Sequence, residues 1–176
     1  MSGIINSVGS KSGIIGINEP EGDCWRLTDT QNGGTGNHEP LGASGSGTLE
    51  RDDTYGYSES LGAGMTESSG VFTFPTTGFW HVNFHMECNY IASDSGRYTY
   101  LSVTTNGGSN WYTASTGRVM LLGGSFAGCS TNKILDVTDT TQVKVRFGVV
   151  GSAATETLGS TSENRTFFTF HKIGRT

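Results

Sequence analysis

The sequence predicts an all-β, antiparallel domain preceded by an extended N-terminal arm. Glycine supplies 27 of the 176 residues, and serine, threonine and aromatic residues are frequent, which is typical of short strands joined by tight turns. Strand-like runs recur at spacings of about ten residues, and no helical periodicity exceeds about two turns. About eight to ten strands in this arrangement favour an antiparallel sandwich, specifically a jelly roll.

Residues 1–22 form the predicted arm, in which Ser-Gly-Ile-Ile occurs twice, at residues 2–5 and 12–15. So little apolar area cannot offset the entropy of ordering this segment alone, so it needs a partner surface. Its apolar contacts would come from four isoleucines: Ile4, Ile5, Ile14 and Ile15. We therefore expect residues 1–22 to be a docking peptide and residues 23–176 to be the folded domain.

The clearest strand pattern lies in residues 70–90, GVFTFPTTGFWHVNFHMECNY. From Trp80 to Cys88 every second residue is apolar, which predicts one side facing the core. Residues 142–149, QVKVRFGV, alternate in the same way. Two predicted strands thus have a polar second side, formed by His81, Asn83 and His85 on one and by Lys144 and Arg146 on the other. A monomeric sheet would leave these side chains in water.

Further strands are predicted along the rest of the chain, each bounded by turn residues. RYTYLSVTT is followed by the turn NGGSN and by WYTAS, and a weak segment lies between NGGTGN and GASGSG. The remaining runs are RVMLL (118–122), ILDVTD (134–139) and RTFFTFHKI (165–173). Pro75 belongs in a connection because it lacks a backbone donor, while Gly70 and Gly78 permit backbone conformations closed to other residues.

Residues 70–86 resemble the strand pair G-x-F-x-x-P-x-x-G-x-Y-x-F-x-F-x-V of the jelly roll shared by complement globular heads and tumour necrosis factor. Residues 136–147 and 166–173 are similar to two later strands of that family. The resemblance implies a tight threefold homotrimer, in which one sheet of each subunit packs on its symmetry mates. It places the subunit interface at the polar second sides: His81, Asn83, His85, Lys144 and Arg146. No collagen-like stalk precedes the domain, and His81 replaces the family's aromatic residue.

The composition excludes several classes of partner. Charged residues make up 15% of the chain and the net charge is −5, so a phosphate-tracking surface for nucleic acid is not expected. No apolar run reaches the eighteen or so residues of a membrane span, so no membrane contact is predicted. Cys24, Cys88 and Cys129 are too few for a disulfide framework, and buried thiols or a Cys88–Cys129 bridge are the two interpretations.

No residue pattern indicates catalysis or a cofactor. His81 and His85 would be about 13 Å apart on a strand, too far to share one metal ion unless a threefold axis brought copies of one histidine together. The string Gly-Gly-Ser-Phe-Ala at 123–127 lacks the final glycine of a nucleophile elbow. We predict no catalytic residue, no metal and no cofactor. Trp111 and Tyr112, next to a turn, are candidate contacts for a receptor or a host-surface glycan, although strand packing is the alternative.

Residues 2–16 also resemble N-terminal segments of predicted marine bacteriophage proteins. Together the resemblances favour a structural virion protein, a trimeric knob that decorates the capsid or forms a head fibre and is docked by its arms on another virion protein. The alternative is the receptor-binding or carbohydrate-binding tip of a tail fibre. Three weak arms acting together could raise affinity by about 10² to 10⁴.

Overall fold

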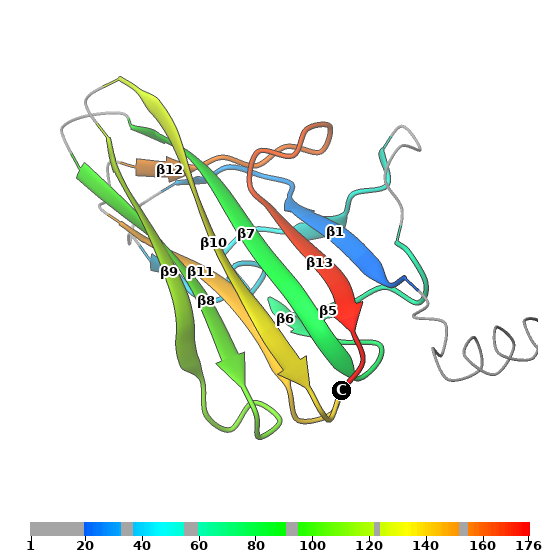
Figure 1. The fold of residues 1–176 in the computed structure, drawn as a ribbon. Coiled ribbons are helices and arrows are strands. Elements are labelled where there is room, and N and C mark those ends of the chain that lie inside the picture. The colour runs from blue at the N-terminus through cyan, green and yellow to red at the C-terminus, as the bar shows by residue number, and fades with distance from the viewer. Residues whose placement is uncertain (1–19, 33–36, 55–59, 91–94, 122–123, 152–154) are drawn as a thin grey trace, which may run out of the picture.

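Two antiparallel sheets pack face to face in the structure, a computed structural model (Figure 1). It describes residues 20–32, 37–54, 60–90, 95–121, 124–151 and 155–176. The four isoleucines of the predicted arm lie outside these residues. The described residues contain strands and turns, and among them no helix has the length and apolar composition needed to cross a membrane. The predicted all-β jelly-roll sandwich is confirmed.

The first sheet has seven strands in the order β2-β12-β7-β13-β1-β4, and β10 pairs with the free side of β7. Its strands are β1 (Gly22–Leu27), β2 (Gln31–Asn32), β4 (Leu49–Arg51), β7 (Gly78–Tyr90), β10 (Phe126–Val137), β12 (Thr155–Thr157) and β13 (Phe167–Gly174). Strand β7 is therefore central, with β10 on one side and β13 on the other.

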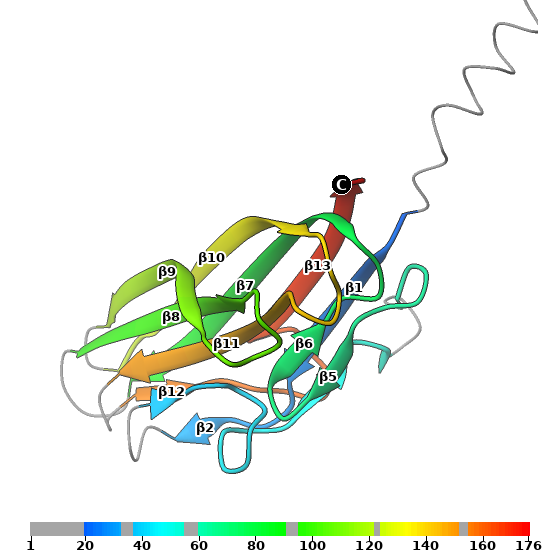
Figure 2. The same cartoon turned by 90° about the horizontal axis from the view of Figure 1, so that it is seen from below.

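The second sheet has six strands in the order β5-β6-β11-β8-β9, and β3 pairs with β11 (Figure 2). Its strands are β3 (Asn37–His38), β5 (Thr66–Ser68), β6 (Val71–Thr73), β8 (Ser95–Thr104), β9 (Tyr112–Leu121) and β11 (Lys144–Gly151). The described residues thus form more strands than the eight to ten expected. The excess consists mostly of edge segments two or three residues long, too short to show a period.

Stacked phenylalanine rings from both sheets form the centre of the core. Phe147 of β11 stacks on Phe168 of β13 with ring centroids 4.5 Å apart, and Phe72 of β6 lies 5.1 Å from Phe170. Aromatic pairs at these separations add to the stabilisation that burial alone provides. The predicted alternation in β7 is confirmed, because its inward residues are all buried: Trp80, Val82, Phe84, Met86 and Cys88.

Two glycines adopt special backbone conformations as the sequence predicts, Gly70 in the turn between β5 and β6 and Gly78 at the start of β7. Gly70 has φ +81°, and a Cβ there would collide with the carbonyl oxygen of Leu41. Gly78 has φ +140°, and a Cβ there would come within 2.5 Å of the carbonyl oxygen of Gly174. Both positions combine a backbone conformation that side chains disfavour with a close backbone approach, so only glycine fits.

A buried ion-pair network closes the edge of the first sheet. The guanidinium of Arg26 on β1 is 1% exposed and donates to Glu50 Oε1 at 2.8 Å and to Asp52 Oδ1 at 2.9 Å. It also donates to the hydroxyl of Thr54 and, at 2.6 Å, to the carbonyl oxygen of Thr161. Because Asp52 is itself buried, its charge is compensated chiefly by Arg26.

We expect Arg26→Ala to lower the free energy of unfolding by about 3 to 5 kcal/mol, because the buried carboxylate of Asp52 loses its counter-ion. Urea denaturation followed by circular dichroism measures the change. The matched control is Arg165→Ala, which removes a partly exposed pair with Glu163 and should cost less than about 1 kcal/mol. Equal losses in the two variants would contradict the role given to Arg26.

Candidate functional site

The outward side of the first sheet carries three of the predicted interface residues side by side. His81, Asn83 and His85 of β7 point away from the hydrophobic core and are half-buried. On β10 their opposite neighbours are Ile134, Asn132 and Ser130, and on β13 they are His171, Thr169 and Phe167. We call the outward surface of β7, β10 and β13 the β7 face.

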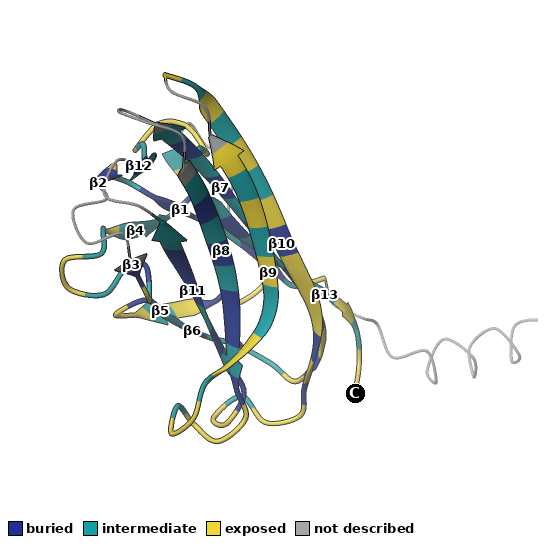
Figure 3. Ribbon diagram, turned by 90° about the vertical axis from the view of Figure 1, so that its left-hand side faces the viewer, coloured by how far each residue is buried: buried dark blue, intermediate teal, exposed yellow. Residues whose placement is uncertain are grey.

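One end of the β7 face is apolar. Phe79, Ile134 and Ile173 come from three adjacent strands and are 38%, 55% and 51% exposed. Ile134 lies opposite His81 on one side, and His171 lies opposite His81 on the other. Figure 3 shows exposed residues along β10, in contrast to the buried interior strands. These three large apolar side chains are exposed at one end of the face, where Asp136 lies opposite Phe79, and a monomeric sheet would normally avoid such exposure.

His85 is enclosed by neighbours from both adjacent strands of this face. Its Nδ1 lies 2.9 Å from Ser130 Oγ, its ring is 5.1 Å from the ring of Phe167, and it lies directly above Gly128, where a Cβ would come within 3.0 Å. This burial lowers the pKa of His85 below its usual 6.5, and the nearby carboxylate of Glu87 opposes the shift.

Lys144 and Arg146 do not belong to the β7 face, and grouping them with its histidines was wrong. Both lie on β11, in the second sheet, and point away from the core on the opposite side of the sandwich. Alternation shows that a side chain points away from the core, but it does not show which of the two sheets carries it. The five predicted interface residues therefore fall on two separate surfaces.

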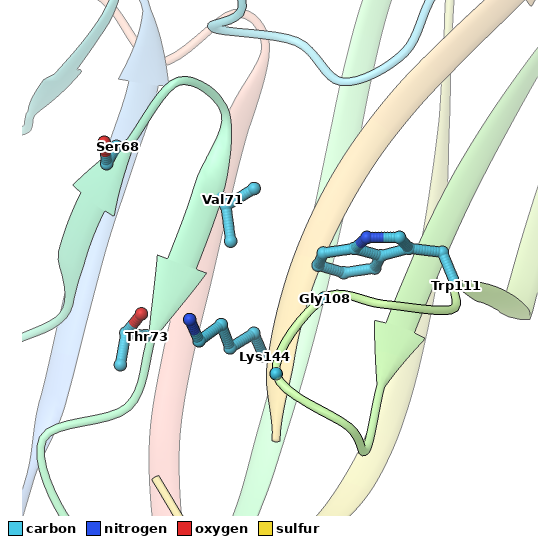
Figure 4. A pocket seen from close by; sticks show the side chains of 7 residues that line it. Ser68, Val71, Thr73, Gly108, Trp111 and Lys144 are labelled. Carbon is cyan, nitrogen blue, oxygen red and sulfur yellow. The ribbon is translucent and has the colours of Figure 1, made fainter. Parts of the chain in front are cut away.

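Lys144 instead lines a hollow beside Trp111, on the outer side of the second sheet (Figure 4). The hollow has a volume of about 350 Å³, and its walls are Ser68, Val71, Thr73, the Gly107–Gly108 turn, Trp111 and Lys144. Trp111 stands on one side, Ser68 and Thr73 on the other, and the side chain of Lys144 reaches between them. Tyr112 is 66% exposed and is not part of this lining.

The turn between β8 and β9 holds Trp111 in place through a dense set of hydrogen bonds. Gly107 donates its amide to the carbonyl oxygen of Gln142 at 3.0 Å, and Gly108 donates to Thr104 Oγ1 at 3.1 Å. The guanidinium of Arg146 lies 4.5 Å from the centre of the Trp111 ring, a cation–π contact. Glu39 pairs with the same guanidinium at 3.5 Å.

The thiols are placed for packing rather than for reaction. Cys88 is buried, Cys24 and Cys129 are half-buried, and all three are free, so the structure contains no Cys88–Cys129 bridge. Burial raises the pKa of Cys24 to about 12 and that of Cys88 to about 11, which leaves both thiols protonated near neutral pH. Within the described ranges no cluster of three or more metal-ligating side chains occurs.

Comparison with known proteins shows the fold. No family model matches the sequence, and no curated protein matches it. Three crystal structures of murine APRIL, determined at pH 8.5, 8.0 and 5.0, are similar to this chain, each with a TM-score of 0.56 and 10% sequence identity. Each alignment covers 88% of this chain and 99% of that chain. The domain is thus a tumour necrosis factor-like jelly roll.

Acidification should destabilise the domain partly through His85. Because the folded-state pKa of His85 lies below 6.5, the unfolded chain binds more protons between these two pKa values, and the free energy of unfolding falls as pH decreases through that window. His85→Gln should flatten this dependence in urea denaturation at pH values on either side of 6.5. A pH dependence as steep in His85→Gln as in the unchanged protein would refute the assignment.

Proposed function

We propose that this chain is a non-enzymatic structural protein of a phage particle, a homotrimer that assembles through the β7 face and docks through residues 1–22. The observation that carries the proposal is the exposure of Phe79, Ile134 and Ile173 at one end of a sheet face with few charges. A face of this kind is stabilised when a second copy of the chain removes it from water.

The distribution of charge supports assembly through this face. From Phe79 to His85 and at the paired positions of β10 and β13, the outward residues include one carboxylate, Asp136, and no lysine or arginine. The centres of protein interfaces are depleted in charged residues in the same way. Histidine, asparagine and threonine at the middle of the face can exchange hydrogen bonds with a neighbouring subunit without the cost of burying a full charge.

Placement on a virion rests on the arm. Residues 1–22 combine isoleucine pairs with glycine, and a threefold assembly would present three such segments to one particle. Linking three weak contacts multiplies their affinity by about 10² to 10⁴ without any new interaction. Binding by three arms suits a protein that must stay attached to the particle, as in capsid decoration or a head fibre. The proposed location is therefore the virion.

A second candidate function is the receptor-binding tip of a tail fibre. The Trp111 hollow favours it, because an accessible aromatic ring next to hydroxyl groups and an ammonium group is suited to a glycan on a host surface. This role uses the same fold and the same trimer. In it the essential contact is the one between the outer side of the second sheet and the host glycan, rather than the contact of the arm with the particle.

Ile134→Asp should convert the trimer into monomers, because a second carboxylate at the apolar end of the interface, near Asp136, would be buried without a partner. Size-exclusion chromatography with light scattering should give three times 18.6 kDa for the unchanged protein and 18.6 kDa for the variant. Met120→Asp, at a 71% exposed apolar residue of the second sheet, is the control and should remain trimeric. A monomeric unchanged protein would overturn the assembly proposal.

Removal of residues 1–19, which keeps Glu21 and the first residue of β1 in place, tests the docking role. If the chain decorates a capsid, the shortened protein should lose binding to isolated particles, and the full chain should ignore host cells. A fibre tip predicts the opposite, namely cell binding that survives the truncation. Cosedimentation with particles and with cells distinguishes the two, and particle binding unaffected by the truncation would exclude the arm as the docking element.

A further inference from the structure

We infer that the hollow beside Trp111 binds an acidic sugar, a pyranose ring that carries a carboxylate. The hollow brings together an aromatic ring, an ammonium group and two hydroxyl groups from three strands and one turn. Its volume of about 350 Å³ lies at the lower end of the range of roughly 300–1,000 Å³ typical of small-molecule sites. The inference does not depend on the trimer or on the docking arm.

Trp111 supplies the surface for the sugar ring. The π-face of an indole is electron-rich, and the C–H bonds on one side of a pyranose ring present a weakly positive, apolar surface that matches it. Arg146 lies over the indole ring at 4.5 Å and holds it in position. Gly108 lies beside the ring, where an added Cβ would be in ordinary contact with the indole at 4.0 Å.

Lys144 supplies the charge that selects an acid. Glu39 already neutralises Arg146, whereas no carboxylate of the described residues lies within ion-pair distance of Lys144. The lysine is half-buried and lies directly opposite Thr73 across the β6–β11 pair, so its ammonium group is directed into the hollow. A ligand carboxylate would complete this ion pair with a charge-assisted hydrogen bond.

Ser68 and Thr73 supply hydroxyl groups for the rest of the sugar. Both belong to the β5–β6 hairpin, and neither side chain forms a hydrogen bond to another described residue. A hydroxyl both donates and accepts, which suits the hydroxyl groups around a pyranose ring. Ordered strands hold these side chains in place before binding, which limits the entropy lost on association.

Another hollow of the domain lacks the combination of ammonium and paired hydroxyl groups found beside Trp111. It has a volume of about 260 Å³ and is lined by Tyr98, Arg118, Val119 and Met120. There the guanidinium of Arg118 lies over the Tyr98 ring at 5.0 Å, as that of Arg146 lies over the Trp111 ring at 4.5 Å, but no lysine of the described residues lines the hollow. That hollow offers mostly apolar contacts and lacks the hydroxyl pair.

The test is a titration of the full chain with the methyl glycosides of glucuronic, galacturonic and N-acetylneuraminic acid, each compared with its neutral methyl ester. The indole N–H resonance of Trp111 reports binding. We expect at least one acid to shift this resonance and to bind about fivefold more tightly than its ester, the ratio that one partly exposed ion pair provides. Lys144→Gln should reduce the acid to the affinity of the ester, and Trp111→Ala should abolish saturation transfer from protein to sugar.

Two matched variants are the controls for the Trp111 and Lys144 substitutions. Tyr112→Ala removes an exposed aromatic residue next to the hollow, and Lys133→Gln removes an exposed lysine of the other sheet; both should bind the acid like the unchanged protein. Ile134→Asp should also bind it, which separates this result from the fate of the trimer. If no acid binds, if acids and esters bind equally, or if inorganic phosphate competes as well as the sugar acids, the assignment is wrong.

Discussion

Interleaving of phenylalanine rings between the two sheets is the constraint on which the rest of the structure depends. Phe72 and Phe147 come from one sheet, Phe168 and Phe170 from the other, and their rings touch at the centre of the sandwich. Because side chains alternate along a strand, fixing these residues inward fixes their neighbours outward. A shift of one residue in β11 or β13 would exchange core and surface, so the core sets the composition of both outer faces.

The two outer faces consequently have different chemistry. The β7 face is poor in charge and exposes three apolar side chains at one end, which suits contact with another copy of the chain. The face of the second sheet carries Lys144, Arg146 and Trp111, which suits a polar ligand. The two proposed roles, assembly through one outer face and ligand binding on the other, can therefore be altered separately.

The inward and outward residues of single strands could be predicted from the alternation of apolar and polar residues. Which outward residues lie next to one another depends on the register between distant strands. Trp80 to Cys88 could be assigned because inward and outward residues differ sharply in type. Ile134 was missed because an isoleucine in a strand suggests core, although Leu135 and Val137 already occupy the inward positions and direct Ile134 outward. Trp111 was identified from its turn, but Lys144 joins it only through the pairing of β11 with β6 and β8.

The entry of the chain into β1 gives the molecule a polarity. Glu21 accepts a hydrogen bond from the ammonium of Lys172 at 2.7 Å and another from the hydroxyl of Thr76 at 2.7 Å. These contacts hold the first described residues beside the C-terminal end of β13. Figure 1 shows the carboxyl terminus at this same end. A fluorescent label or affinity tag attached after Thr176 would therefore lie near the start of β1. One inserted between β9 and β10 would lie at the opposite end of the sandwich.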